Sequence, residues 1–129
     1  YILQSSKLPC GFEVWRGPGT PGSSLSRGLP KEKHHIASLY RKLNELAEAI
    51  LKRYEIYRGN EINKVLMLHR GRHATKYHRW LEQTIIRMEE YARQTGKEFE
   101  EIWSQCRDWI GENPDILRGK FWENLDEIP

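Results

Sequence analysis

All five histidines of the chain lie in two short stretches. His34 and His35 are adjacent in the first stretch, and His69, His73 and His78 fall in the second. Neutral imidazole is both a base near pH 7 and a ligand for borderline metal ions such as zinc. The two stretches therefore have the residue types for one metal centre with one imidazole left to act as a base.

The adjacent pair suits two different tasks, because neighbouring side chains at the end of a strand point to opposite sides of the backbone. One ring can ligate a metal ion while the other faces a phosphate. Asn63 lies between the two histidine stretches and can fix the ring of a base by a hydrogen bond. Phosphodiester hydrolysis needs an activated water, a cation at the leaving oxygen and positive charge around the phosphoryl oxygens. Our hypothesis is a one-metal nuclease.

The spacing in the second stretch does not decide which of its histidines bind the metal. His73 and His78 are five residues apart, whereas two ligands on one helical face are expected four apart. His69 and His73 have that spacing, but Gly71 lies between them and argues against a continuous helix.

The net charge of +3 is small for a nucleic-acid-binding protein, but the charge is unevenly distributed. No carboxylate occurs from His69 to Arg79. A local basic patch beside a metal site can attract a phosphodiester. From charge and position alone, we predict that Arg70, Arg72 and Lys76 contact phosphate.

A chain of 129 residues is expected to form one domain, or one domain with an arm. We expect an arm and a Gly/Pro/Ser-rich linker over residues 1–30 and the folded domain over residues 31–129. No apolar run approaches the roughly 20 residues of a membrane span, so no membrane partner is expected. The sequence begins at Tyr1, without a Met and without a signal-peptide pattern. We therefore expect that it is a piece of a longer polypeptide. The sequence does not decide whether Cys10 and Cys106 pair.

The hydrophobic pattern predicts an α+β fold that is mostly helical. Leucines and other apolar residues at spacings of three and four indicate a helix over residues 39–54, which Gly59 follows. Residues 62–68 form a short apolar run bounded by turns. This pattern favours a strand with Asn63, Val65 and Met67 on one face. A second helix should begin near His73 or Ala74.

The C-terminal half is predicted to be helical. The second helix should bury a stripe consisting of Tyr77, Trp80, Leu81, Thr84, Ile85, Met88 and Ala92. Residues 95–98 resemble a capping box for a third helix, which should bury Phe99, Ile102, Trp103, Cys106 and Ile110. Asn113 and Pro114 resemble the start of a last short helix through Leu117. Phe121 and Trp122 should fold back onto the core.

The motifs together resemble the HNH/endonuclease VII superfamily, and more narrowly the AHH-type nuclease domains at the C-termini of bacterial polymorphic toxins. The resemblance rests on residues 33–36, 54–56, 61–66, 69–73 and 77–78. Two residues depart from the family: Lys33 stands where Ala is usual, and Arg72 where Pro or Ser is often found. The resemblance implies a ββα-metal (His-Me finger) core with added helices.

The resemblance also implies a role for each histidine. His34 would bind the metal, His35 would be the general base, and Asn63 would orient His35. His73, with His78 or His69, would supply the remaining ligands. The cofactor would be one divalent metal ion, with zinc or nickel favoured by the ligand type and magnesium possible.

The resemblance further implies a secreted or delivered effector that cleaves DNA in the cytoplasm of a target cell, and that has a cognate immunity protein. Three alternatives stay open. The first is a non-catalytic, zinc-stabilised module that binds nucleic acid or protein and whose four ligands close the metal site. The second is a helical interaction domain with incidental histidines. The third is a nuclease whose substrate is RNA.

Overall fold

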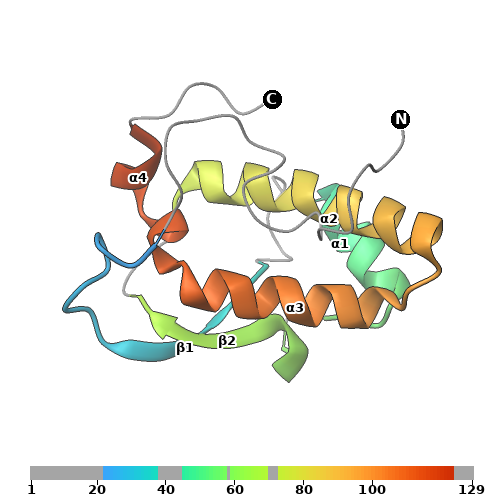
Figure 1. Cartoon of the computed structure of the whole chain (residues 1–129), viewed down its shortest axis with the longest axis horizontal. Coiled ribbons are helices and arrows are strands. Elements are labelled where there is room, and N and C mark those ends of the chain that lie inside the picture. Colours follow the sequence, from blue (N-terminus) through green and yellow to red (C-terminus); the bar gives the residue numbers. More distant parts are fainter. Residues whose placement is uncertain (1–21, 38–44, 58, 70–72, 124–129) are drawn as a thin grey trace.

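The computed structural model describes residues 22–37, 45–57, 59–69 and 73–123. In chain order (Figure 1), their elements are β1 (Lys31–His35), α1 (Glu45–Arg53), η3 (Glu61–Asn63), β2 (Lys64–Leu68), α2 (Thr75–Thr95), α3 (Phe99–Glu112), η4 (Pro114–Leu117) and α4 (Gly119–Glu123). The predicted α+β, mostly helical class is confirmed. In these residues no helix combines the length and apolar character needed to cross a membrane.

The two strands form an antiparallel sheet in which His34 pairs with Val65 and His35 with Lys64. The predicted strand at residues 62–68 begins two residues late, because residues 61–63 form a turn of 3-10 helix. Its alternation is as predicted: Met67 is buried, whereas Leu66 is 55% exposed. This sheet, followed by α2, gives the expected ββα core.

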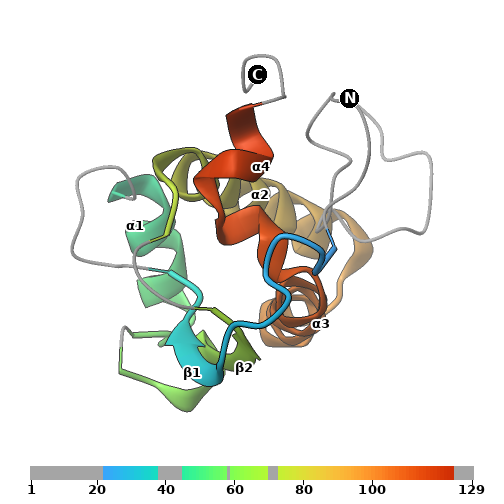
Figure 2. The same cartoon turned by 90° about the vertical axis from the view of Figure 1, so that its left-hand side faces the viewer.

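Helix α2 is the central element of the core. All seven residues of its predicted apolar stripe are buried. The helix ends at Gly96, whose φ of 75° lies in the left-handed region that glycine adopts readily. Helices α2 and α3 run in opposite directions (Figure 1), while α1 packs against α2 and α3 packs against β2. In Figure 2, α1, α2, α3 and the two-stranded sheet are arranged around the centre of the molecule.

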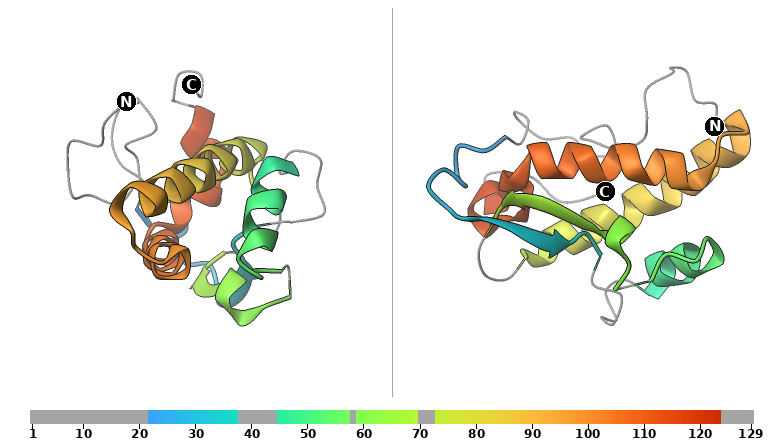
Figure 3. Two further views of the ribbon diagram at one scale, coloured as in Figure 1. Left: turned by 90° about the vertical axis from the view of Figure 1, so that its right-hand side faces the viewer. Right: turned by 90° about the horizontal axis from the view of Figure 1, so that it is seen from below.

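Helix α3 approaches the sheet closely at Gly111. A Cβ atom at this position would lie 2.7 Å from Cγ2 of Val65, which is closer than packed carbon atoms allow. The five residues predicted to be buried on α3 are all buried. Seen from below (right-hand view of Figure 3), α3 lies along the sheet. The glycine therefore lets α3 support the strand residue that pairs with His34.

The first helix differs from its prediction. Residues 39–44 of the predicted helix lie outside the described residues, and α1 covers Glu45–Arg53. Leu46 is 62% exposed, because α1 turns Ala47, Ile50 and Leu51 towards the core instead. The helix ends before Gly59: Glu55 adopts a φ of 58°, and the Ile56 amide donates to the Leu51 carbonyl.

Of the two predicted helix caps, the one at Thr95 was wrong and the one at Asn113 is confirmed in position. Thr95 does not cap α3; its hydroxyl donates to the Tyr91 carbonyl within α2, and Glu98 is the N-cap residue. Asn113 is the N-cap residue of η4 and Pro114 follows it, but the Asn113 side chain makes no cap bond and donates to the Trp109 carbonyl instead. In both cases the side chain binds a backbone oxygen of the preceding helix.

The predicted short helix after Pro114 is confirmed as the 3-10 helix η4, and α4 follows it. Trp122 folds back as expected, since it is buried and donates to the Ile116 carbonyl at 2.7 Å. Phe121 packs against the core and is partly buried. Cys106 is buried and disulfide-bonded, whereas Cys10 lies outside the described residues.

The segment that precedes β1 is fastened to Asp115. The carboxylate of Asp115 accepts hydrogen bonds from the Ser26 hydroxyl at 2.8 Å, the Leu25 amide at 2.9 Å and the Ser24 hydroxyl at 3.2 Å. Farther on, the Pro30 carbonyl accepts a bond from the His69 amide. These contacts fix the backbone that leads into β1, because Asp115 holds residues 24–26 and the His69 amide holds Pro30. The first part of the predicted arm, residues 1–21, lies outside the described residues.

Candidate metal centre

Three of the five histidines meet at one point of the structure. One ring nitrogen from each of His34, His69 and His73 lies within 4.8 Å of the others. His34 is in β1, His69 follows β2, and His73 is two residues before α2. The ring centroids are 4.2 Å apart for His34 and His69, and 4.7 Å apart for His69 and His73. The ββα arrangement therefore brings together side chains that are up to 39 residues apart in the sequence.

The donor atoms of this cluster fit a metal ion. Nε2 of His69 is buried and has no hydrogen-bond partner among the residues described. Nε2 of His34 lies 3.4 Å from a carboxylate oxygen of Glu32, without hydrogen-bond geometry. A buried polar atom without a partner costs roughly 1–3 kcal/mol. A cation bound between these rings would remove that cost, and imidazole nitrogens suit zinc or nickel.

His78 does not belong to the group of three. It lies on α2, is buried, and stacks on His73 with ring centroids 5.6 Å apart. Because His73 precedes α2 and His78 lies within it, helical spacing does not decide how the two side chains are placed. Of the two ligands that the sequence left open beside His73, the structure brings His69 to the cluster.

His35 is the last residue of β1 and is partly buried. It is adjacent to His34, yet it is outside the three-histidine group found among the described residues. Because it pairs with Lys64 on the neighbouring strand, its position is set by the same register that places His34. The adjacent histidines thus differ in one respect: His34 belongs to the three-histidine group and His35 does not.

Asn63 holds the chain that leaves β1. Its side-chain oxygen accepts from the Ala37 amide and its side-chain nitrogen donates to the Ala37 carbonyl, both at 3.0 Å. Its own carbonyl accepts from the Ile36 amide at 2.7 Å. The sequence predicts that Asn63 orients the ring of His35; these three hydrogen bonds act on the backbone directly after His35. They fix the direction in which the strand ends.

Tyr77 supports the same turn from α2. Its hydroxyl donates to the Ile36 carbonyl at 2.7 Å, and the side chain is completely buried. Burial raises the pKa of Tyr77 far above its ordinary value, because the phenolate would lose its hydration. The hydroxyl therefore stays protonated and remains a hydrogen-bond donor at any physiological pH.

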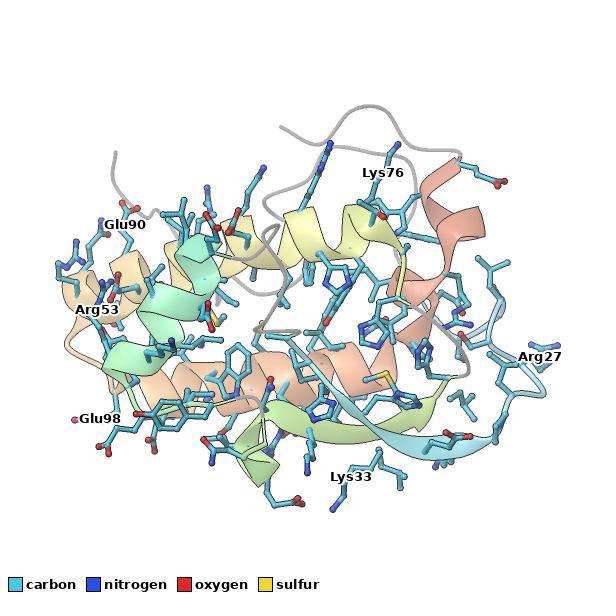
Figure 4. The ribbon with its side chains drawn as sticks, turned by 180° about the vertical axis from the view of Figure 1, so that it is seen from behind. Arg27, Lys33, Arg53, Lys76, Glu90 and Glu98 are labelled. Atoms are coloured by element: carbon cyan, nitrogen blue, oxygen red, sulfur yellow. The ribbon has the colours of Figure 1, made fainter. Side chains whose placement is uncertain are left out.

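The predicted phosphate contacts fall partly outside the described residues, since Arg70 and Arg72 are not among them. Lys76 is in the first turn of α2, where it lines a pocket with Ala74, Gly119 and Trp122. Figure 4 shows Lys76 pointing outward from α2. Lys76 therefore adds positive charge on the outer side of the helix start.

A cationic residue that the sequence did not single out lies at the cluster. Nη2 of Arg118 contacts Nδ1 of His69. Burial lowers the pKa of Arg118, although a guanidinium stays protonated in either case. Arg118 is 49 residues from His69 in the sequence and lies in no histidine motif, so spacing gives no signal for it.

The described residues thus place three imidazoles around one point on a ββα core. The sequence profile of AHH, a nuclease family of the HNH/ENDO VII superfamily with a conserved AHH, matches residues 20–109. The match covers 90 of the 129 residues, and the chain belongs to this family. No curated protein and no solved structure matches the chain significantly.

Replacing Asn63 by alanine should destabilise the fold. The substitution leaves the amide and the carbonyl of Ala37 without their partner in a buried place, at roughly 1–3 kcal/mol each. We expect urea denaturation to show a loss of about 3 kcal/mol in the free energy of unfolding. The control is Asn60→Ala, which removes an exposed bond to the Tyr57 amide. Equal losses for the two variants would contradict the role given to Asn63.

Proposed function

We propose that this protein is a metal-dependent endonuclease that hydrolyses the phosphodiester bonds of DNA. One observation carries the proposal: nitrogen atoms of His34, His69 and His73 converge, while His35 lies outside the group although it is adjacent to a member. A ligand set and a separate base are the two parts that metal-assisted hydrolysis requires.

His34, His69 and His73 would hold one divalent cation. When bound, such an ion lowers the pKa of its water and stabilises charge on the leaving oxygen. Catalytic zinc sites have three protein ligands and an open position, whereas structural sites have four. The three-histidine group supports a catalytic site over a zinc-stabilised binding module. Zinc or nickel is the ion that imidazole ligands favour, and magnesium is the alternative.

His35 would accept a proton from the attacking water at a ring nitrogen. For this task the ring must stay neutral and must be held at the end of β1. The bonds from Asn63 to Ala37, and from Tyr77 to Ile36, fix the backbone that follows His35. Asn63 would therefore be a positioning residue, because it acts on His35 through the backbone.

The substrate class follows from the family and from the charge. A nuclease of the HNH/ENDO VII superfamily acts on nucleic acid, and Arg70, Arg72 and Lys76 supply positive charge after the second strand. We propose duplex DNA as the substrate and make RNA an outcome of the test. Attack in line would leave a 5′-phosphate and a 3′-hydroxyl.

Purified protein with zinc, nickel or magnesium should cut supercoiled plasmid, and EDTA should abolish the cut. His35→Ala should lower the rate by at least about 100-fold, which is the lower range for losing a general base. Calorimetry should show that His35→Ala binds zinc as the wild type does, whereas His69→Ala binds it weakly. A His35→Ala variant that cuts at the parental rate would refute the assigned base. Digestion of RNA with intact plasmid would reassign the substrate.

The resemblance to C-terminal toxin domains supports a biological role. We propose that the chain is the toxin domain of a secreted or delivered bacterial effector, which acts in the cytoplasm of a target cell and is neutralised by a cognate immunity protein. The arrangement of a compact nuclease behind a Gly/Pro/Ser-rich stretch suits such a domain.

Induced expression of the wild type inside a bacterium should stop growth and fragment the chromosomal DNA, because hydrolysis of the host genome is lethal. Expression of His35→Ala to the same level should leave growth unchanged. Colony counts and DNA electrophoresis measure the two effects. Normal growth with an intact chromosome, at a wild-type level seen by immunoblot, would count against the toxin role.

A further inference from the structure

We propose that Arg118 binds the phosphodiester of the substrate at the three-histidine cluster. The inference rests on the proposed nuclease function and adds a substrate-binding residue to it. Arg118 lies beyond residues 20–109, so the family match does not include it. It is also distinct from Arg70, Arg72 and Lys76, which the charge pattern indicated.

Backbone hydrogen bonds fix the position of Arg118. The residue lies between η4 and α4, and its amide donates to the Asp115 carbonyl at 2.9 Å while its carbonyl accepts from the Phe121 amide. The Leu117 carbonyl accepts from the Ala74 amide at 3.0 Å. Residue 117 is therefore tied to the residue that follows His73, and Arg118 is brought to the cluster by this connection.

The contact between Arg118 and His69 cannot persist while His69 is a metal ligand. A neutral imidazole has one N–H and one lone pair, and a guanidinium can only donate. If Nδ1 accepts from Arg118, the ring proton is on Nε2 and neither nitrogen has a lone pair left for a cation. If His69 ligates through Nδ1 or Nε2, Nδ1 either uses its lone pair or carries the proton. Arg118 must then release His69.

The released guanidinium remains next to the cluster, since the backbone of Arg118 is held in place. A guanidinium and a metal ion beside the same imidazole repel each other, and an anion bound between them offsets that repulsion. A phosphodiester has the right charge, and its non-bridging oxygens match the donor fork of a guanidinium. The geometry thus favours a phosphate that is shared by Arg118 and the cation at the histidines.

The test compares Arg118→Ala and Arg118→Lys with Arg93→Ala, which removes the same charge from an exposed site. Arg93 is 18 residues beyond Thr75 on α2, about 27 Å away along the helix. Binding of a labelled DNA duplex is measured by anisotropy against salt, with zinc present and in the His35→Ala background. Zinc affinity is measured by calorimetry, and folding by thermal unfolding followed by circular dichroism.

We expect Arg118→Ala to weaken duplex binding and to lower the slope of log K against log salt by about 0.9, the value for one phosphate contact. Zinc affinity should be no lower than in the wild type, because Arg118 competes for His69. In the parental background kcat/KM should fall about 100-fold. Arg118→Lys, which keeps the charge and serves if the alanine variant does not fold, should retain part of the binding. Arg93→Ala should behave as the wild type.

Three results would overturn the proposal. The salt slope of Arg118→Ala could equal that of Arg93→Ala, or zinc affinity could fall while duplex binding stays the same. Tighter duplex binding and faster cleavage by Arg118→Ala would make Arg118 an obstruction rather than a ligand. A wild type that binds DNA without cutting it would end the nuclease proposal alone, because the salt slope would still report the contact of Arg118.

Discussion

The site depends on hydrogen bonds at the two ends of the β1–β2 pair. At one end the side chain of Asn63 binds both backbone groups of Ala37, and at the other the His69 amide donates to the Pro30 carbonyl. Buried polar groups that are fully paired define one arrangement of the chain, because any slip leaves them unsatisfied. The register that puts His34 opposite Val65 is thereby fixed, and so is the distance from His34 to His69.

The rest of the chain supports this sheet and adds charge to it. Gly111 allows α3 to rest on Val65, the strand residue opposite His34. The segment from Pro114 to Glu123 lies beyond the family match and is joined to the start of α2 through the carbonyl of Leu117. Within this segment, Arg118 is the residue whose side chain contacts the three-histidine cluster, through His69.

Local pattern predicted much of the fold and singled out the three histidines that the structure brings together. Helices α2 and α3 were predictable because their apolar stripes have the helical period, and the ββα core was implied by the resemblance to the HNH/endonuclease VII superfamily. Asn63 could be singled out, but its contact with Ala37 depends on where β1 ends. The Thr95 cap failed since its hydroxyl binds the preceding helix. Arg118 could not be found, because a contact between residues 49 apart leaves no spacing in the sequence.

X-ray absorption at the zinc edge counts the imidazoles around the ion and so separates the metal ligands from the base. Protein loaded with one equivalent of zinc should show three imidazole nitrogens at about 2.0–2.1 Å and at least one oxygen. The same count should hold for His35→Ala, and it should drop to two for His69→Ala. Four imidazoles in the wild type and three in His35→Ala would make His35 a ligand, and the account of a separate base would be wrong.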